Sequence, residues 1–263
     1  MKLVRFRRGN EILYGVLEGE TILALKGSPF DEGWDYDNPC YGDGRCRLND
    51  VTLLAPCEPT KYLGLGMNYK DLAAQVGAEI PTRPLTYSKP LCAVIGPGEK
   101  ILMTREACED KTGEGMIYEG ELCVVIGKKG KHIARENAYD YVLGYTCTND
   151  VTFRNEHGKD MIHSKGADGF GPIGPCISNE VDPCRAHIRS WVNGEKRQDG
   201  YSDQMVFDVP STIAYFSSYM TLMPGDVIAT GTPAGVRSIQ AGDVIRIEID
   251  GIGVLENTVA DDL

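Results

Sequence analysis

The stretch Glu119-Gly120-Glu121-Leu122-Cys123-Val124-Val125-Ile126-Gly127 predicts a strand that enters the protein core, with two acids at its mouth. Leu122 to Ile126 is an unbroken apolar run that ends at a glycine, which is typical of a buried strand. Residues i and i+2 of a strand point the same way, so Glu119 and Glu121 share one face. A solvated strand face is the alternative interpretation. Beside a core, however, two like charges need a cation between them.

A third acid is expected at the same site. Asp150 comes directly after the predicted strand Tyr145-Thr146-Cys147-Thr148-Asn149. Three carboxylates without a thiol or imidazole cluster form an oxygen-only donor set, which suits Mg²⁺, Mn²⁺ or Ca²⁺ better than zinc. The nine cysteines contain no CxxC pair, so structural zinc is not expected.

Basic residues and glycines surround these acids in the sequence. Lys89, Arg154 and Lys165 are candidate ligand contacts, and Lys165 stands just before the glycine-rich residues 169–175. Each cation taken alone is more often a solvated surface residue. Thr230-Gly231-Thr232-Pro233 follows a predicted strand, and such a turn can present N–H groups to an anion. The glycine spacing is not that of a P-loop, and no GxSxG elbow occurs. The residues alone therefore indicate a metal-assisted site for an anionic ligand.

The rest of the chain predicts a mixed α/β, β-dominated protein. Residues 1–30 read as a small antiparallel meander, and residues 31–50, rich in Asp, Gly, Asn and Pro, as a loop or linker. We place a small N-terminal β-rich domain at residues 1–52 and a catalytic domain at residues 53–263.

Two turns and two helices add detail to this prediction. Asn193-Gly194 and Asp250-Gly251 are hairpin signals. Residues 135–141 and 210–220 are the predicted helices, the second with a proline at its start.

Charge and hydropathy exclude several functions. The chain has 27 Lys+Arg against 38 Asp+Glu, a net charge of −11, so its long-range field repels nucleic acids and anionic membranes. Its apolar runs are too short to cross a bilayer, and its start does not resemble a signal peptide. We therefore expect a cytoplasmic protein with free thiols.

In their order, the motifs resemble the fumarylacetoacetate hydrolase family from about residue 51 to the end. The resemblance rests on Leu53-Leu54-Ala55-Pro56, Gly66-Met67-Asn68-Tyr69, Ser88-Lys89-Pro90, Tyr118-Glu119-Gly120-Glu121-Leu122, Asp150-Val151-Thr152-Phe153-Arg154, Val192-Asn193-Gly194 and Thr230-Gly231-Thr232-Pro233.

The resemblance implies a β-roll with a smaller N-terminal piece, usually assembled as a homodimer. It implies one Mg²⁺ or Mn²⁺ held by Glu119, Glu121 and Asp150, and chelated by a small-molecule 2-oxo acid substrate. Lys165 and Thr232 are expected to touch that substrate. The further candidates are Tyr69, Lys89 and Asp168 for substrate binding and Arg154 and His157, with Lys165, for catalysis.

One departure from the family pattern favours a particular reaction. Hydrolytic members carry a His and a Glu on a lid helix, at positions that hold Leu72 and Gln75 here. The sequence therefore favours an isomerase or tautomerase of a 2-oxo/2-hydroxy-alkenoic diacid, similar to 2-hydroxyhepta-2,4-diene-1,7-dioate isomerase. One alternative is an acylpyruvate or fumarylacetoacetate-type hydrolase, or an oxaloacetate decarboxylase, with its base moved to His157 or His163. Another is an inert protein that binds a metal–oxoacid complex.

Overall fold

The computed structural model describes residues 1–109, 115–154 and 160–261. It confirms a mixed α/β, β-dominated fold, built around one large sheet with the strand order β4-β3-β2-β1-β14-β12-β11-β17-β6-β7. Two further strands join this sheet, because β5 pairs with β1 and β8 pairs with β14. The strands are β1 (Lys2–Arg8), β2 (Glu11–Glu18), β3 (Thr21–Leu25), β4 (Tyr41–Arg47), β5 (Thr52–Leu53), β6 (Tyr62–Gly66), β7 (Leu85–Lys89), β8 (Val94–Ile95), β11 (Gly120–Ile126), β12 (Val142–Asn149), β14 (Gly171–Ser178) and β17 (Val227–Ala229).

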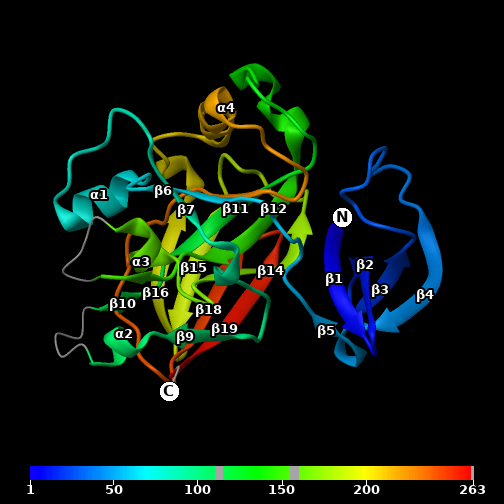
Figure 1. Ribbon diagram of the computed structural model, residues 1–263, viewed down its shortest axis with the longest axis horizontal. Helices are drawn as coiled ribbons and strands as arrows, with labels where there is room; N and C mark the ends of the chain where they lie inside the picture. The colour runs from blue at the N-terminus through cyan, green and yellow to red at the C-terminus, as the bar shows by residue number, and fades with distance from the viewer. Residues whose placement is uncertain (110–114, 155–159, 262–263) are drawn as a thin grey trace.

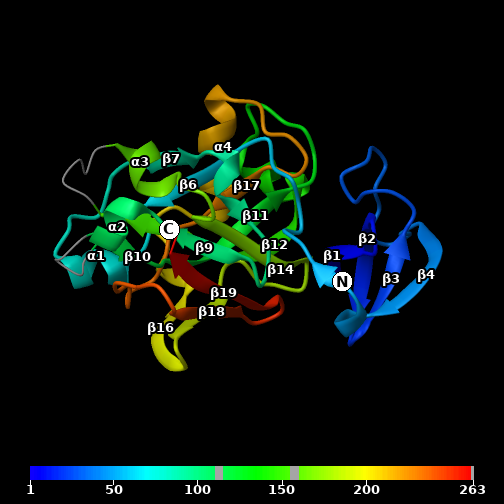
Figure 2. The same ribbon diagram turned by 60° about the horizontal axis from the view of Figure 1, so that its bottom comes forward.

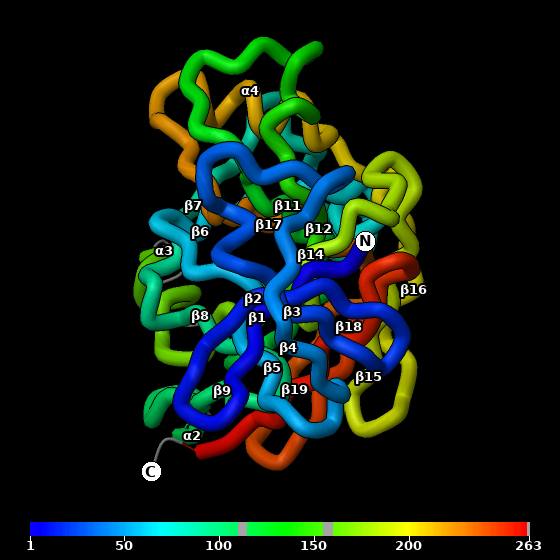
Figure 3. The backbone as a smooth tube through the Cα atoms, turned by 90° about the vertical axis from the view of Figure 1, so that its right-hand side faces the viewer, coloured from blue at the N-terminus to red at the C-terminus, as the bar shows by residue number. Residues whose placement is uncertain are grey.

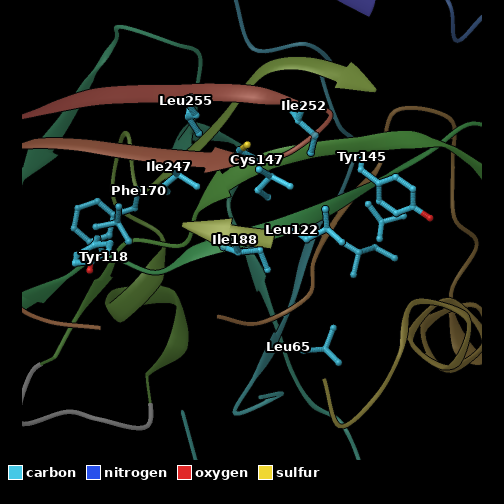
Figure 4. Close-up of a cluster of buried hydrophobic side chains, with 14 of the residues drawn as sticks. Leu65, Tyr118, Leu122, Tyr145, Cys147, Phe170, Ile188, Ile247, Ile252 and Leu255 are labelled. Carbon is cyan, nitrogen blue, oxygen red and sulfur yellow. The ribbon is translucent and has the colours of Figure 1, made fainter. Parts of the chain in front are cut away.

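A five-stranded sheet packs against the large one, in the order β16-β15-β18-β19-β9. Its strands are β9 (Lys100–Met103), β15 (His187–Val192), β16 (Glu195–Tyr201), β18 (Val244–Ile249) and β19 (Gly253–Asp261), and a separate short ribbon pairs β10 (Met116–Ile117) with β13 (Thr152–Phe153). Figure 4 shows Leu122 and Cys147 of the large sheet in one buried cluster with Ile188, Ile247 and Leu255 of the smaller one. This shared apolar core fixes the acid-bearing strand β11 in place.

Strands β1 to β3 form the antiparallel meander that was predicted for residues 1–30, and β4 extends it. The four strands lie at one end of the molecule (Figure 1). Its first strand also pairs with β14, and Figure 3 shows the meander in front of the strands that carry the site. The prediction of a loop or linker over residues 31–50 is wrong in part, because β4 occupies Tyr41–Arg47. Strand β4 packs closely against β3 at one of its glycines. A Cβ atom at Gly44 would lie only 3.1 Å from the Cβ atom of Ala24.

Three of the four helices that the structure describes lie at the other end of the molecule. The helices are α1 (Lys70–Val76), α2 (Arg105–Glu109), α3 (Met161–Lys165) and α4 (Val209–Tyr219), with 3₁₀ turns at η1 (Leu48–Asp50), η2 (Leu91–Ala93), η3 (Arg135–Tyr141) and η4 (Ser202–Gln204). Figures 1 and 2 both show α1, α2 and α3 at the side opposite β1–β4. The helical predictions for residues 135–141 and 210–220 are confirmed as η3 and α4.

The predicted hairpin at Asn193-Gly194 connects β15 to β16, and both residues have the positive φ angles, 52° and 81°, that this tight turn requires. None of the nine cysteines, all of which lie in the described part of the chain, forms a disulfide bond. Among the residues that the structure describes, no helix has the length and apolar character of a membrane span.

Candidate metal centre

The short ribbon of β10 and β13 sets two of the three acids side by side. Its register places Ile117 opposite Thr152, and the pairing continues because the Asp150 N–H donates to the Glu119 carbonyl at 2.9 Å. Directly opposite residues, and alternate residues along each strand, share a face. The side chains of Glu119, Asp150, Ile117 and Thr152 therefore lie on one face of the ribbon. Glu121, the first acid of β11, follows on the same side.

The structure brings the three carboxylates together. Glu119, Glu121 and Asp150 each offer an oxygen, and these atoms all lie within 4.8 Å of one another. Glu121 and Asp150 are each only 1% exposed. An all-oxygen set of three carboxylates matches the ligand preference of Mg²⁺ or Mn²⁺.

Glu121 is the carboxylate that most needs a cation. Burial raises its pKa well above the ordinary value, and the charges of Asp150 and Glu119 raise it further. Its side chain accepts a hydrogen bond from the Gly231 N–H at 2.7 Å, but it forms no ion pair within the described part of the chain. A divalent ion among these groups would supply the missing positive charge, so the residues present fit the metal that the family resemblance implies.

Lys165, at the end of α3, places its ammonium group among the acids. Its Nζ atom donates to Glu119 Oε2 at 2.8 Å and to Thr152 Oγ1 at 2.7 Å, and it forms an ion pair with Asp150. Burial alone would lower the pKa of Lys165, but Asp150 and Glu119 outweigh burial and raise it. Tyr87 lies below the ammonium, with the ring centroid 4.5 Å from Nζ, and its hydroxyl donates to Asp150.

Lys89 supports the site from inside the protein. Its side chain is fully buried, with Nζ 2.7 Å from Asp150 Oδ1. It also donates to the carbonyl oxygens of Val151, Lys165 and Phe170 at 2.8–2.9 Å. Burial lowers the pKa of Lys89 to about 8, although Asp150 opposes this. These contacts use all the donors of the ammonium group, so Lys89 holds Asp150 and three backbone segments in position.

The Thr230–Pro233 loop is tied to the strand that carries the acids. The Thr232 hydroxyl donates to the Gly120 carbonyl at 2.8 Å and accepts from Gln198 Nε2 at 2.7 Å. Gln198 also accepts from the Gly120 N–H at 3.1 Å. Thr232 is 2% exposed, so its hydroxyl is committed to these internal bonds. Gln198 is a site residue that the sequence analysis missed.

The other predicted residues lie in different surroundings. Tyr69 is fully buried beside Gly231. Burial raises the pKa of its hydroxyl and the charge of Glu121 raises it further, so Tyr69 lies near the metal centre. Asp168 is exposed and lies beside Cys92. Arg154 is exposed and lines a hollow of its own. His157 lies outside the described residues.

Helix α1 carries the two positions where the sequence departs from hydrolytic relatives. Leu72 is buried in the hydrophobic core, 7% exposed. Gln75 Oε1 accepts from the Gly235 N–H at 2.6 Å, and Asp71 Oδ2 accepts from the Ala234 N–H at 3.1 Å. These two bonds tie α1 to the loop beside the acids, and neither Leu72 nor Gln75 can serve as a proton acceptor.

Comparison with known families decides the assignment. Residues 61–260 match the family described as fumarylacetoacetate (FAA) hydrolase C-terminal, and residues 1–56 match one described as Rv2993c-like, N-terminal. The chain belongs to the fumarylacetoacetate hydrolase family. This is a family of enzymes. The resemblance, and the fold that the resemblance implies, are confirmed.

Members of the fumarylacetoacetate hydrolase family that resemble this chain include tautomerases and isomerases. The oxaloacetate tautomerase YisK of Bacillus subtilis is 40% identical over 228 residues, which cover 81% of this chain and 74% of the relative. The solved structure of a 5-carboxymethyl-2-hydroxymuconate delta-isomerase from Mycobacterium smegmatis has a TM-score of 0.89 and 35% identity, and all of both chains is covered.

A third comparison concerns the metal. The maleylpyruvate hydrolase of Sphingobium sp. SYK-6 was solved in complex with manganese (II) ion and pyruvate. It has a TM-score of 0.80 and 29% identity to this chain, with all of both chains covered. Enzymes of the family bind a divalent metal, and the acidic triad of this chain is a set of residues that could bind one.

Proposed function

We propose that the chain is a divalent-metal-dependent isomerase or tautomerase of a 2-oxo or 2-hydroxy-alkenoic diacid. The observation that carries this proposal is the convergence of Glu119, Glu121 and Asp150, with ligand oxygens within 4.8 Å of one another. The printed activities of the tautomerase and isomerase relatives support it.

The chain's own residues would divide the work at this site. The triad would hold Mg²⁺ or Mn²⁺, which supplies a Lewis acid for the negative charge that develops on the substrate's 2-oxygen as a neighbouring C–H bond breaks. Lys165 adds a second positive charge beside the carboxylates. Lys89 and Tyr87 fix Asp150 from behind, so that the triad keeps its shape.

The side chains of α1 favour a reaction that only transfers a proton over one that hydrolyses the substrate. Tautomerisation only moves a proton between carbon and oxygen of the substrate, so it needs no activated water. Hydrolysis needs a base for that water, and loss of a general base typically costs about 10²–10⁴ in rate. Leu72 and Gln75 offer none.

A hydrolase or decarboxylase with a relocated base is the second candidate. The observation in its favour is a histidine–carboxylate pair, in which His163 Nε2 lies 3.1 Å from Glu106 Oε2. His163 precedes Lys165 by two residues on α3, however. Residues at that spacing point about 200° apart around a helix, so His163 faces away from the triad that Lys165 enters.

Assays of the purified chain with Mg²⁺ or Mn²⁺ test the proposal. We expect the enol form of oxaloacetate, or a related enol diacid, to be converted to its keto form at a rate that a chelator abolishes. Glu121→Gln should lose this activity, whereas Glu256→Gln, an exposed acid on β19, should retain it. Rapid acylpyruvate cleavage without tautomerase activity would contradict the proposal.

Two further measurements separate the alternatives. If cleavage is found and His163→Asn abolishes it, the hydrolase candidate replaces the tautomerase. If the chain binds Mg²⁺ and oxalate, raises its melting temperature and turns over no substrate, it is a binding protein. We also propose a homodimer, as the family resemblance implies, and light scattering of the purified chain checks it.

A further inference from the structure

The backbone between the two glutamates of the triad is held by side chains as well as by the strand ladder. The Glu119 N–H donates to Asn149 Oδ1 at 3.0 Å, and the Gly120 N–H donates to Gln198 Oε1 at 3.1 Å. The Gly120 carbonyl accepts from the Thr232 hydroxyl at 2.8 Å. Side chains from three other segments of the chain therefore fix the peptide units that separate the two carboxylates.

These side chains act from the face of β11 opposite to the carboxylates. Gly120 stands between the two glutamates, so its position faces the other side of the strand. A Cβ atom there would lie 2.9 Å from Gln198 Oε1 and 3.3 Å from Ile247 Cγ1. Gly120 is directly opposite Asn149 in the ladder, so the Asn149 side chain points to this same face. Both amides reach the backbone from behind and take no position among the carboxylates.

The two amide side chains are buried and differ in how their donors are used. Gln198 is fully buried, and its Nε2 atom donates to Thr232 Oγ1 at 2.7 Å and to the Pro233 carbonyl at 2.8 Å. Asn149 is 1% exposed, and its Nδ2 atom has no hydrogen-bond partner among the described residues. A buried donor without a partner lowers stability. Stability alone therefore does not explain Asn149, whereas its bond to the Glu119 N–H gives it a role at the metal centre.

We infer that Asn149 and Gln198 are positioning residues, which fix the spacing of the Glu119 and Glu121 carboxylates and thereby favour a small divalent ion. This inference rests on the proposed function and concerns the ion that this function requires. Mg²⁺ needs nearly octahedral ligands at about 2.0–2.1 Å, whereas Ca²⁺ accepts a flexible ligand set at about 2.3–2.6 Å. A rigid pair of carboxylates therefore selects Mg²⁺, and a loosened pair loses that selectivity.

Two variants of similar side-chain size test the inference. Asn149→Leu removes the acceptor of the Glu119 N–H, and Gln198→Met removes the acceptor of the Gly120 N–H. Calorimetric titration with MgCl₂ and with CaCl₂ gives both dissociation constants. We expect Mg²⁺ to bind about 10–100-fold more weakly, as when residues that orient metal ligands are removed. The affinity for Ca²⁺ should change by no more than about threefold, because Ca²⁺ tolerates variable ligand geometry.

Asn257→Leu is the matched control. Asn257 is likewise buried, at 3% exposed, and donates to the carbonyl oxygens of Gly96 and Glu99. Its replacement should lower the melting temperature and leave both ion affinities unchanged. A purely structural role of Asn149 and Gln198 would give the same result as this control. The ratio of the Mg²⁺ and Ca²⁺ affinities therefore separates positioning from folding.

Circular dichroism melts establish which variants are folded, and the result in either folded variant decides the inference. An unchanged Mg²⁺ affinity in Asn149→Leu or Gln198→Met would overturn it. So would equal losses for Mg²⁺ and Ca²⁺, because the amides would then support the site without selecting the ion. Both results leave the proposed function in place. A wild-type chain that binds neither ion would refute the proposed function, and the ion selectivity with it.

Discussion

Two carboxylates of the metal centre, Asp150 and Glu121, are each only 1% exposed and differ in how their charges are satisfied. Asp150 is paired with Lys89 and Lys165. Glu121 accepts a hydrogen bond from the Gly231 N–H and forms no ion pair within the described part of the chain. A buried charge has lost its water and needs a partner charge. The fold supplies that partner to Asp150 and leaves Glu121 to be compensated by a bound cation.

Removal of a buried charge should have the largest effect. Lys89→Met deletes the ion pair to Asp150 and three hydrogen bonds to carbonyl oxygens. It leaves the carboxylate buried, and the expected loss is about 3–5 kcal/mol in the free energy of unfolding. Urea denaturation measures it. Lys196→Met is the matched control, because Lys196 is exposed and pairs with Asp199, and it should cost no more than about 1 kcal/mol. Equal losses of stability in Lys89→Met and Lys196→Met would show that burial of the Lys89 ion pair does not matter.

Metal binding should stabilise the folded chain, and the gain should depend on Glu121. At a free Mg²⁺ concentration about 100 times its dissociation constant, we expect the free energy of unfolding to rise by about 2.7 kcal/mol. Glu121→Gln should lose this gain. Without metal, the variant should be at least as stable as wild type, because it removes a charge that burial disfavours. Thermal melts with and without chelator measure both. A metal-free variant much weaker than wild type would contradict this account of Glu121.

The same residue predicts the pH dependence of the metal-free chain. Burial, then Asp150 and Glu119, raise the pKa of Glu121 above 4.5, its ordinary value. The folded state then binds more protons than the unfolded state, so stability falls as pH rises from about 4.5 through the raised pKa. Urea unfolding with chelator should show this fall in wild type and a smaller one in Glu121→Gln. Parallel profiles would contradict it.

Asp150 titrates outside the pH range in which this fall in stability is expected. Burial would raise its pKa, but Lys165 and Lys89 outweigh burial and lower the pKa to about 2. Its contribution to stability is lost only as pH falls through that value, and it is complete above 3.8, its ordinary pKa. The metal centre thus contains two acids, Glu121 and Asp150, whose contributions to stability change with pH in opposite directions.

The link between the acids and the neighbouring loop should have a smaller effect. Gln198→Ala removes hydrogen bonds to Gly120, Thr232 and Pro233 inside the protein, and groups left unsatisfied there cost about 1–3 kcal/mol in the free energy of unfolding. Gln204→Ala, whose side chain donates to Asp203, should cost less. Chemical denaturation compares the two. A Gln198 effect no greater than that of Gln204 would show that the loop is held by other contacts.

Local patterns in the sequence predicted a large part of the fold and of the metal centre. The apolar run after Glu121, the hairpin at Asn193-Gly194 and the acid after a second strand are short-range signals, and the structure has each of them. The rule that i and i+2 share a strand face could also have placed Tyr87 beside Lys89, and both are buried on β7. Strand β4 was missed because glycine and aspartate are rare in strands.

The remaining contacts join segments that are far apart in sequence. Lys89 and Asp150 are separated by 61 residues on the chain, and the loop bonds of Gln198 depend on how two sheets pack. Single-residue patterns contain no signal for these contacts, because a lone lysine or glutamine is most often a solvated surface residue. Helix α1 falls where the family resemblance implies a lid helix. Helices α2 and α3 were missed for a related reason, since helices of one or two turns are formed by packing and not by propensity.

The smallest effect on stability is expected at an exposed charge far from such pairing. Arg237→Gln removes an exposed charge, and such surface changes usually stay within about 0.5 kcal/mol. Urea denaturation measures the difference. A variant that loses several kcal/mol would place Arg237 in the fold, like Lys89, and would show that burial alone does not decide which charges the fold depends on.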